Sequence, residues 1–153
     1  MRFMRIPVAG GEPKLIFVTE GLYNNISCSR IPGGVCAISE MDGKATTVSL
    51  FDPIRGRGPR LFAEDSKHRA LLSPDGKHFA YLVPRTPHRY IRITNLHGVT
   101  EADLSVAGVD YLNHLKWSAD SSGFFTSDVR ANETRLLHVE RSGASQILWT
   151  VWR

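Results

Sequence analysis

The chain has 153 residues, which is enough for one domain with a sizeable hydrophobic core. Hydrophobic residues make up 42% and charged residues 22%, as in soluble globular proteins, and the absence of any apolar run near ~20 residues predicts no membrane insertion. The net charge of +4 favours acidic partners, but the cations are scattered over turns and strand faces, which argues against a specific nucleic-acid groove.

The N-terminal segment predicts two strands joined by a glycine turn. Its sequence MRIPVAGGEPKLIFV has short apolar runs on both sides of Gly10. The segment contains basic residues but lacks the apolar stretch of about 7–15 residues that a signal peptide needs. We therefore expect any export signal to lie outside this chain.

Two cysteines, Cys28 and Cys36, flank a predicted turn at residues 30–34. They are too few to define a disulfide scaffold. A hairpin register that places them opposite one another would allow a disulfide, provided that the Cβ atoms come within ~4 Å. We favour free buried thiols and keep the disulfide as the alternative. No further ligands occur at zinc-site spacing, so a metal site is not predicted.

The run ALLSPDGKHFAYLV predicts a strand, a tight turn and a second strand. The turn consists of Ser73, Pro74, Asp75 and Gly76. Proline presets φ at the first corner, aspartate can accept hydrogen bonds from the backbone ahead of it, and glycine tolerates a positive φ. The alternation of apolar and polar residues in HFAYLV and YIRITNL is typical of strands. We interpret these four residues as turn structure.

A second copy of this pattern, HLKWSADSSGFFTSD, lies further along the chain. Ser118 and Asp120 repeat the serine and aspartate of the turn, while Ala119 replaces proline and Ser121 replaces glycine. We interpret Trp117, directly before the turn, as a wedge between adjacent repeats. A tryptophan that stacks on a ligand is the alternative.

A repeat length in the low-to-mid forties organises the whole chain. Glycines of equivalent strand–turn–strand segments are spaced by 46, 42 and 45 residues, at Gly10, Gly56, Gly98 and Gly143. Four short strand signals per repeat are typical of one blade of a β-propeller. Solenoid repeats of this length are helical, yet no segment shows sustained helical apolar spacing. The sequence therefore predicts an all-β fold of propeller blades, each with four antiparallel strands.

The predicted blades do not complete a ring. Within a single propeller region (1–153), residues 1–18 would supply an outer half-blade, and residues 22–64, 66–107 and 110–151 three fuller blades. Closed propellers have about four to eight blades. We expect the chain to be a piece of a longer protein. Self-association that completes the propeller and an open ring with protected edges are the alternatives.

The runs LLSPDGKHFAYL and LKWSADSSGFFTSD resemble TolB-like propeller repeats, also called WD-repeat-like repeats. The stretch SCSRIPGGVCAISEMDGK and the later SLFDPIRGRGPRLF are similar to propellers downstream of kinase or winged-helix regions in soil bacteria such as acidobacteria. In such proteins the propeller is generally a sensing or protein-binding module, often extracytoplasmic. The resemblance therefore implies a bacterial binding module outside the cytoplasm. It implies neither kinase nor DNA-binding activity, because those domains are not in this sequence.

No catalytic constellation is predicted. The segment 143–147 approaches a serine-hydrolase G-x-S-x-G motif but lacks its closing glycine. The histidines fall in different strands or turns, so we predict no metal site, no cofactor and no enzymatic activity; they are His68, His78, His88, His97, His114 and His138.

A non-enzymatic binding or scaffold propeller that recognises a protein or peptide is therefore the predicted function. The alternative is an accessory propeller that senses a ligand or gates access in a larger bacterial regulator, kinase or peptidase. Residues alone do not identify the cell compartment, which only the resemblance addresses.

Overall fold

A computed structural model of the chain describes residues 1–20, 23–65, 68–85, 88–109 and 111–152. All the regular secondary structure in these ranges is β-strand. The described residues contain no helix that could cross a membrane. The strands form one two-stranded and three four-stranded antiparallel sheets. The predicted all-β class, with four-stranded blades and an incomplete ring, is confirmed.

Each sheet consists of strands that are consecutive in the chain, so short turns suffice to connect them. The half-blade contains β1 (Arg2–Arg5) and β2 (Lys14–Val18). Blade 1 contains β3 (Tyr23–Cys28), β4 (Cys36–Asp42), β5 (Ala45–Asp52) and β6 (Gly56–Glu64). Blade 2 contains β7 (Leu71–Leu72), β8 (His78–Val83), β9 (Tyr90–Asn95) and β10 (Thr100–Leu104). Blade 3 contains β11 (Leu112–Trp117), β12 (Gly123–Val129), β13 (Glu133–Glu140) and β14 (Ser145–Trp152).

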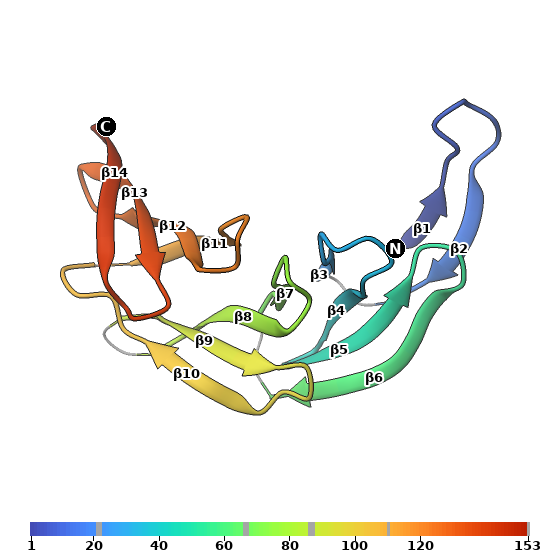
Figure 1. Cartoon of the computed structure of the whole chain (residues 1–153), viewed down its shortest axis with the longest axis horizontal. Coiled ribbons are helices and arrows are strands. Elements are labelled where there is room, and N and C mark those ends of the chain that lie inside the picture. Colours follow the sequence, from blue (N-terminus) through green and yellow to red (C-terminus); the bar gives the residue numbers. More distant parts are fainter. Residues whose placement is uncertain (21–22, 66–67, 86–87, 110, 153) are drawn as a thin grey trace.

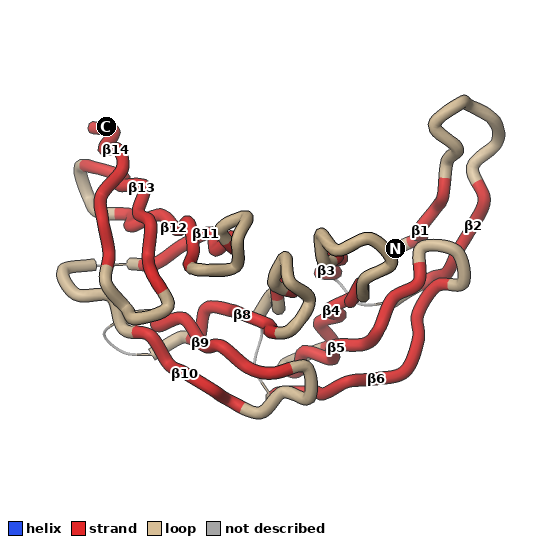
Figure 2. Tube along the Cα trace, viewed as in Figure 1, coloured by secondary structure: helices blue, strands red, loops and turns tan. Residues whose placement is uncertain are grey.

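The four sheets follow one another along an open arc (Figure 1). The first strands of the blades, β3, β7 and β11, lie on the concave side, and the last strands, β6, β10 and β14, lie on the convex side (Figure 2). The half-blade stands at one end of the arc and blade 3 at the other. Consequently the first strands of all three blades converge on the concave side.

Alternation along β8 explains how the blades pack. Phe79 and Tyr81 point into the hydrophobic cluster shared with blade 1, where Val48 and Phe62 are also buried. Ala80, between them, points into the opposite cluster, which blade 2 shares with blade 3. A strand with apolar residues on both faces is buried between two sheets. Blade 2 is therefore covered on both sides, as the inner layer of a stack.

The half-blade covers the outer face of blade 1 through aromatic contacts. The rings of Phe3 and Phe17 stack with centroids 4.6 Å apart, and Phe17 lies 5.7 Å from Phe51 of β5. Gly56 of β6, with φ of +92°, leaves room for this approach, because a Cβ there would lie 3.3 Å from Ile16 and Phe17. The same blade-on-blade packing thus extends to the two-stranded sheet.

The hairpin of blade 1 joins Cys28 and Cys36 in a disulfide. The register of β3 and β4 makes these cysteines direct cross-strand partners, so their side chains leave the hairpin side by side. The structure therefore holds the alternative state, the disulfide, rather than the free thiols that the sequence favours. Register decides this point, and the sequence of an irregular turn does not reveal register.

Candidate binding surface on the concave side

The turn between β7 and β8 is held together by its own side chains. Ser73 Oγ accepts hydrogen bonds from the backbone N–H groups of Lys77 (3.2 Å) and His78 (3.0 Å), and Asp75 Oδ1 accepts one from Lys77 N–H (3.1 Å). Burial raises the pKa of the Asp75 carboxyl. The hydrogen bonds from Ser73 and Lys77 lower this pKa by more than burial raises it, so the pKa lies below the usual value. These contacts stabilise a tight turn and engage Asp75 Oδ1 within it.

The equivalent turn of blade 3 uses the same chemistry. Ser118 Oγ donates to Asp120 Oδ1 at 2.7 Å, and the carboxylate also accepts the backbone N–H and the hydroxyl of Ser122. The hydrogen bond from Ser118 and then those from Ser122 lower the pKa of Asp120 to about 2. Asp75 and Asp120 therefore both accept hydrogen bonds from within their own turns.

Hydrogen bonds connect these turns from one blade to the next. The backbone N–H of Arg30 donates to the carbonyl of Pro74 at 2.8 Å, and the backbone N–H of Asp75 donates to Ser121 Oγ at 3.0 Å. Ser121 occupies the place of Gly76 and adopts a left-handed φ of 63°. Sequence reasoning missed this residue, because a serine at a glycine position reads as a weakened motif.

We expect Ser121→Ala to destabilise the fold by about 1 kcal/mol, because it leaves the partly buried Asp75 N–H without its acceptor while the left-handed backbone remains. Ser121→Gly loses the same hydrogen bond but relieves the backbone, so it should cost less. Thermal melts of the two variants check this order. If Ser121→Ala melts at the same temperature as Ser121→Gly or higher, the Ser121 hydroxyl does not stabilise the contact between the blades.

Trp117 lies between blades 2 and 3. Its indole Nε1–H donates to the carbonyl of Leu71 in β7 at 2.9 Å, and its ring centroid lies 4.3 Å from that of Phe124. The ring is partly buried against the cluster that the two blades share. Its hydrogen-bonding group is directed to the neighbouring blade. These contacts join blade 3 to blade 2 at this position.

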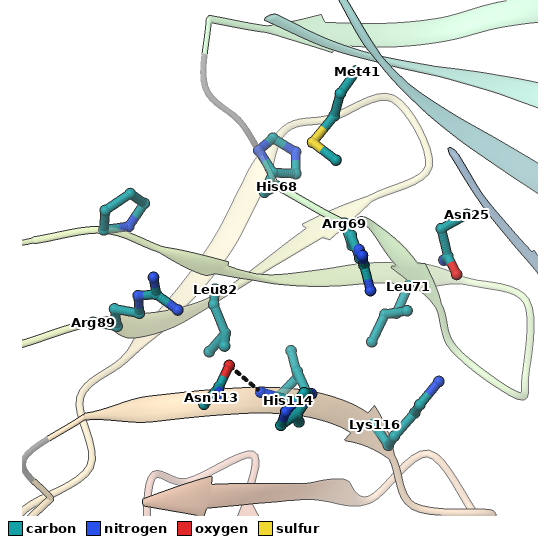
Figure 3. A pocket seen from close by; sticks show the side chains of 12 residues that line it. Asn25, Met41, His68, Arg69, Leu71, Leu82, Arg89, Asn113, His114 and Lys116 are labelled. Atoms are coloured by element: carbon teal, nitrogen blue, oxygen red, sulfur yellow. Dashed lines mark hydrogen bonds between the residues drawn. The ribbon is translucent and has the colours of Figure 1, made fainter. Parts of the chain in front are cut away.

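A pocket of about 510 Å³ opens where the first strands of the blades converge (Figure 3). Arg69 and Leu71 extend toward His114 and Lys116 of β11, across the pocket. Its lining comes from all three blades and consists of Asn25, Met41, His68, Arg69, Leu71, Leu82, Pro84, Arg89, Asn113, His114, Leu115 and Lys116. Residues 91 positions apart in the chain therefore share one surface.

Among the residues that the structure describes, the lining is basic and contains no carboxylate. Arg69 and Lys116 are exposed. Arg89 lies with its guanidinium 4.3 Å from the centre of the Tyr111 ring and donates to the Leu112 carbonyl at 3.4 Å. Three permanent positive charges thus face a partly apolar hollow, in which an anionic group finds attraction without repulsion.

One lining histidine is neutral at pH 7. The ring of His68 is buried and stacks on Tyr81 with centroids 3.8 Å apart. Burial, followed by the positive charge of Arg92, lowers the pKa of His68 to about 4. His68 therefore forms part of the wall and adds no charge.

His114 is held in a strained conformation at the edge of the pocket. It has a φ of 53° at an irregularity in the β11–β12 register, and its backbone N–H donates to Asn113 Oδ1 at 3.1 Å. β-Bulges change the direction in which side chains point. Non-glycine residues with a left-handed φ are found preferentially at functional sites. The sequence contains no signal for it, because neither glycine nor proline marks the position.

No group of three His, Cys, Asp or Glu side chains in the described part of the chain could hold a metal ion. The histidines occupy unlike surroundings: His68 is stacked in the wall, His114 lies at the pocket edge, and His78 Nε2 lies 3.2 Å from Glu101 Oε2. The pocket therefore offers cations, amides and apolar side chains as its binding groups.

Comparison with known proteins supports the fold. The sequence matches no protein-family model and no curated protein. Among solved structures, TolB from Acinetobacter baumannii is similar with 19% identity and a TM-score of 0.71, over 94% of this chain and 36% of that one. A putative TolB from Agrobacterium tumefaciens has 17% identity and a TM-score of 0.71, over 97% of this chain and 56% of that one. A chain of a nidogen–laminin complex has 18% identity and a TM-score of 0.65, over 95% of this chain and 55% of that one.

The predicted TolB-like propeller fold is thereby confirmed, since nearly the whole chain aligns with a TolB and with a putative TolB. The chain spans between about a third and just over half of the length of these structures. Identities below one fifth support the fold alone.

Proposed function

We propose that the chain is a non-enzymatic binding module that recognises an acidic peptide or protein segment in the pocket on its concave side. The observation that carries this proposal is a lining whose described residues include three permanent cations and no carboxylate. Apolar side chains such as Leu71, Leu82 and Leu115 lie among the cations. Such a surface can cover the apolar parts of a peptide while it pairs with its carboxylates.

A protein ligand fits the lining better than a nucleic acid does. Bases bind single-stranded-nucleic-acid proteins by stacking on exposed aromatic rings. The described lining residues include no phenylalanine, tyrosine or tryptophan. No lining residue in the described ranges carries a hydroxyl, thiol or carboxyl group that could act as a nucleophile beside a histidine. These features support binding without catalysis.

We expect the chain to bind a fluorescein-labelled oligo-glutamate peptide and not an oligo-lysine peptide of the same length. Lys116→Glu should weaken binding roughly 10-fold or more, because it replaces an attraction by a repulsion in the pocket. Added salt should weaken binding of the unchanged chain, since exposed charges are screened. Fluorescence anisotropy measures all three effects.

Lys44→Glu provides the matched control for this experiment, because Lys44 is exposed in the β4–β5 turn and is not in the pocket lining. It changes the net charge equally. The proposal fails if both variants weaken binding to the same extent, or if the two peptides bind alike.

A second function, an accessory propeller that senses or gates within a larger bacterial regulator, kinase or peptidase, is favoured by one observation. The chain aligns with only 36% to 56% of each similar structure named above. A kinase, winged-helix or peptidase segment encoded next to this one would support it. The Cys28–Cys36 disulfide supports an extracytoplasmic location for either function, since disulfides persist in oxidising compartments.

A further inference from the structure

The face of blade 3 that points away from blade 2 exposes large apolar side chains. Phe125, Leu136 and Trp149 are 39%, 37% and 64% exposed. They come from three adjacent strands, and Leu136 is the cross-strand partner of Trp149. The Phe125 ring lies 5.2 Å from that of its partner His138. The exposed side chains therefore form one continuous face.

This face repeats one that is covered elsewhere in the molecule. The cross-strand pair Ile91 and Leu104 of blade 2 lies 45 residues before the pair Leu136 and Trp149. Ile91 and Leu104 are 0% and 8% exposed, because they lie in the cluster shared with blade 3. The exposed face of blade 3 is thus built like a blade-to-blade contact surface.

At the other end of the arc, the half-blade exposes the face that points away from blade 1. Phe3 and Phe17 pack toward Phe51 on one side. The next cross-strand pair, Met4 and Leu15, follows an irregularity in the register, points to the other side and is 45% and 54% exposed. Each sheet has one face toward the sheet before it in the chain and one face toward the sheet after it. Within the chain, the second kind of face packs on the first kind in the next sheet.

We propose that the exposed face of blade 3 binds the exposed face of the half-blade of a second copy, so that two copies close one ring. A two-stranded half-blade would cover the outer strands β13 and β14, where Trp149 is the most exposed side chain of the three. It covers the outer strand β5 of blade 1 in the same way within the chain. The interface between copies continues the packing already present.

The shape of the chain fits a ring of two copies. Its four sheets follow an open arc whose two ends lie on the same side (Figure 1). Two copies supply twice the three four-stranded blades and twice the one half-blade of a single chain, and closed propellers have about four to eight blades. Head-to-tail contacts end in a ring when the rotation closes.

Native mass spectrometry and light scattering over a series of concentrations test this proposal. We expect a species of twice 17.1 kDa that dissociates into single chains on dilution. A mass of 17.1 kDa at every concentration would overturn the proposal. Masses that grow beyond two copies would also overturn it, because they indicate an open assembly.

Two single variants distinguish a head-to-tail contact from any other. Trp149→Asp and Leu15→Asp should each weaken dimerisation roughly 30-fold or more, because each buries a charge at the interface. Their equimolar mixture should regain a dimer, since a mixed pair keeps one unaltered contact. A mixture that remains monomeric, or a Leu15→Asp variant that dimerises normally, would refute the head-to-tail arrangement.

Val99→Asp is the control for added charge. Val99 is 60% exposed in the β9–β10 turn of blade 2, in the middle of the arc. It should dimerise like the unchanged chain, and its failure to do so would count against the proposed faces. Because Trp149 is largely exposed, a circular-dichroism melt is expected to show the variant folded; Leu136→Asp repeats the test on the same face.

Discussion

Trp117→Ala is expected to lower the free energy of unfolding by about 3 kcal/mol. The indole fills space between blades 2 and 3, where it lies 4.3 Å from Phe124, and its N–H donates to the Leu71 carbonyl at 2.9 Å. Alanine leaves a cavity in the shared cluster and an unpaired carbonyl. Chemical denaturation, followed by circular dichroism, measures the change.

Two further variants separate the contributions of the indole. Trp117→Phe keeps most of the ring and removes the donor, so it should cost about 1 kcal/mol. Trp152→Ala is the control, because Trp152 is 73% exposed, and it should change stability by no more than about 0.5 kcal/mol. If Trp117→Ala costs no more than the control, the indole does not hold the blades together. Such a result would favour the ligand-stacking interpretation.

Gly76→Val is expected to cost about 2 kcal/mol or more. Gly76 has a φ of +70°, which a β-branched residue adopts only under strain. A Cβ there would also lie 3.1 Å from Ser29 Cβ and 3.4 Å from Val35 Cγ2 of blade 1. Valine therefore strains the turn and presses the turns of two blades apart. Denaturation midpoints measure the cost.

Gly43→Val provides the matched control, because Gly43 has a φ of +55° but nothing within 4 Å of a built Cβ. It should show the backbone cost alone, about 1 kcal/mol. The excess at Gly76 then reports the contact between blades 1 and 2. Equal costs at both glycines would mean that this contact yields without penalty.

Both variants bear on the proposed binding pocket. Trp117 follows the lining residue Lys116, and its hydrogen bond fixes the carbonyl of the lining residue Leu71. The turns that contain Gly76 and Ser121 connect the same blades through Pro74 and Asp75. The binding surface therefore depends on contacts that hold neighbouring blades in register.

Local chemistry explains why the fold could be predicted. The turn at Ser73 and Asp75 is formed by side chains within five residues of one another. The alternation in β8 sends Phe79 and Ala80 to opposite faces. Both signals are short-range, so the strands and the turn of each repeat can be predicted from the residues of that repeat alone. The regular spacing of the copies then indicates a propeller.

The pocket could not be predicted in this way. Asn25, Leu71 and Lys116 meet only because three blades converge on the concave side. The bulge at His114 depends on the β11–β12 register, and the neutrality of His68 on burial against Tyr81. In the sequence, the scattered cations are interpreted as solvent-exposed residues of turns and strand faces. Only the folded arc brings some of them onto one surface.

The strands, the turns and their repetition follow from the amino-acid sequence, because backbone preference and alternation act over a few residues. The tertiary structure decided which side chains share a surface, that Cys28 and Cys36 are bonded, and that Ile91 is covered whereas Leu136 is exposed. Ile91 and Leu136 occupy equivalent places in the repeat. They differ because one blade has a neighbour on that side within the chain and the other does not, and burial depends on neighbours rather than on sequence pattern.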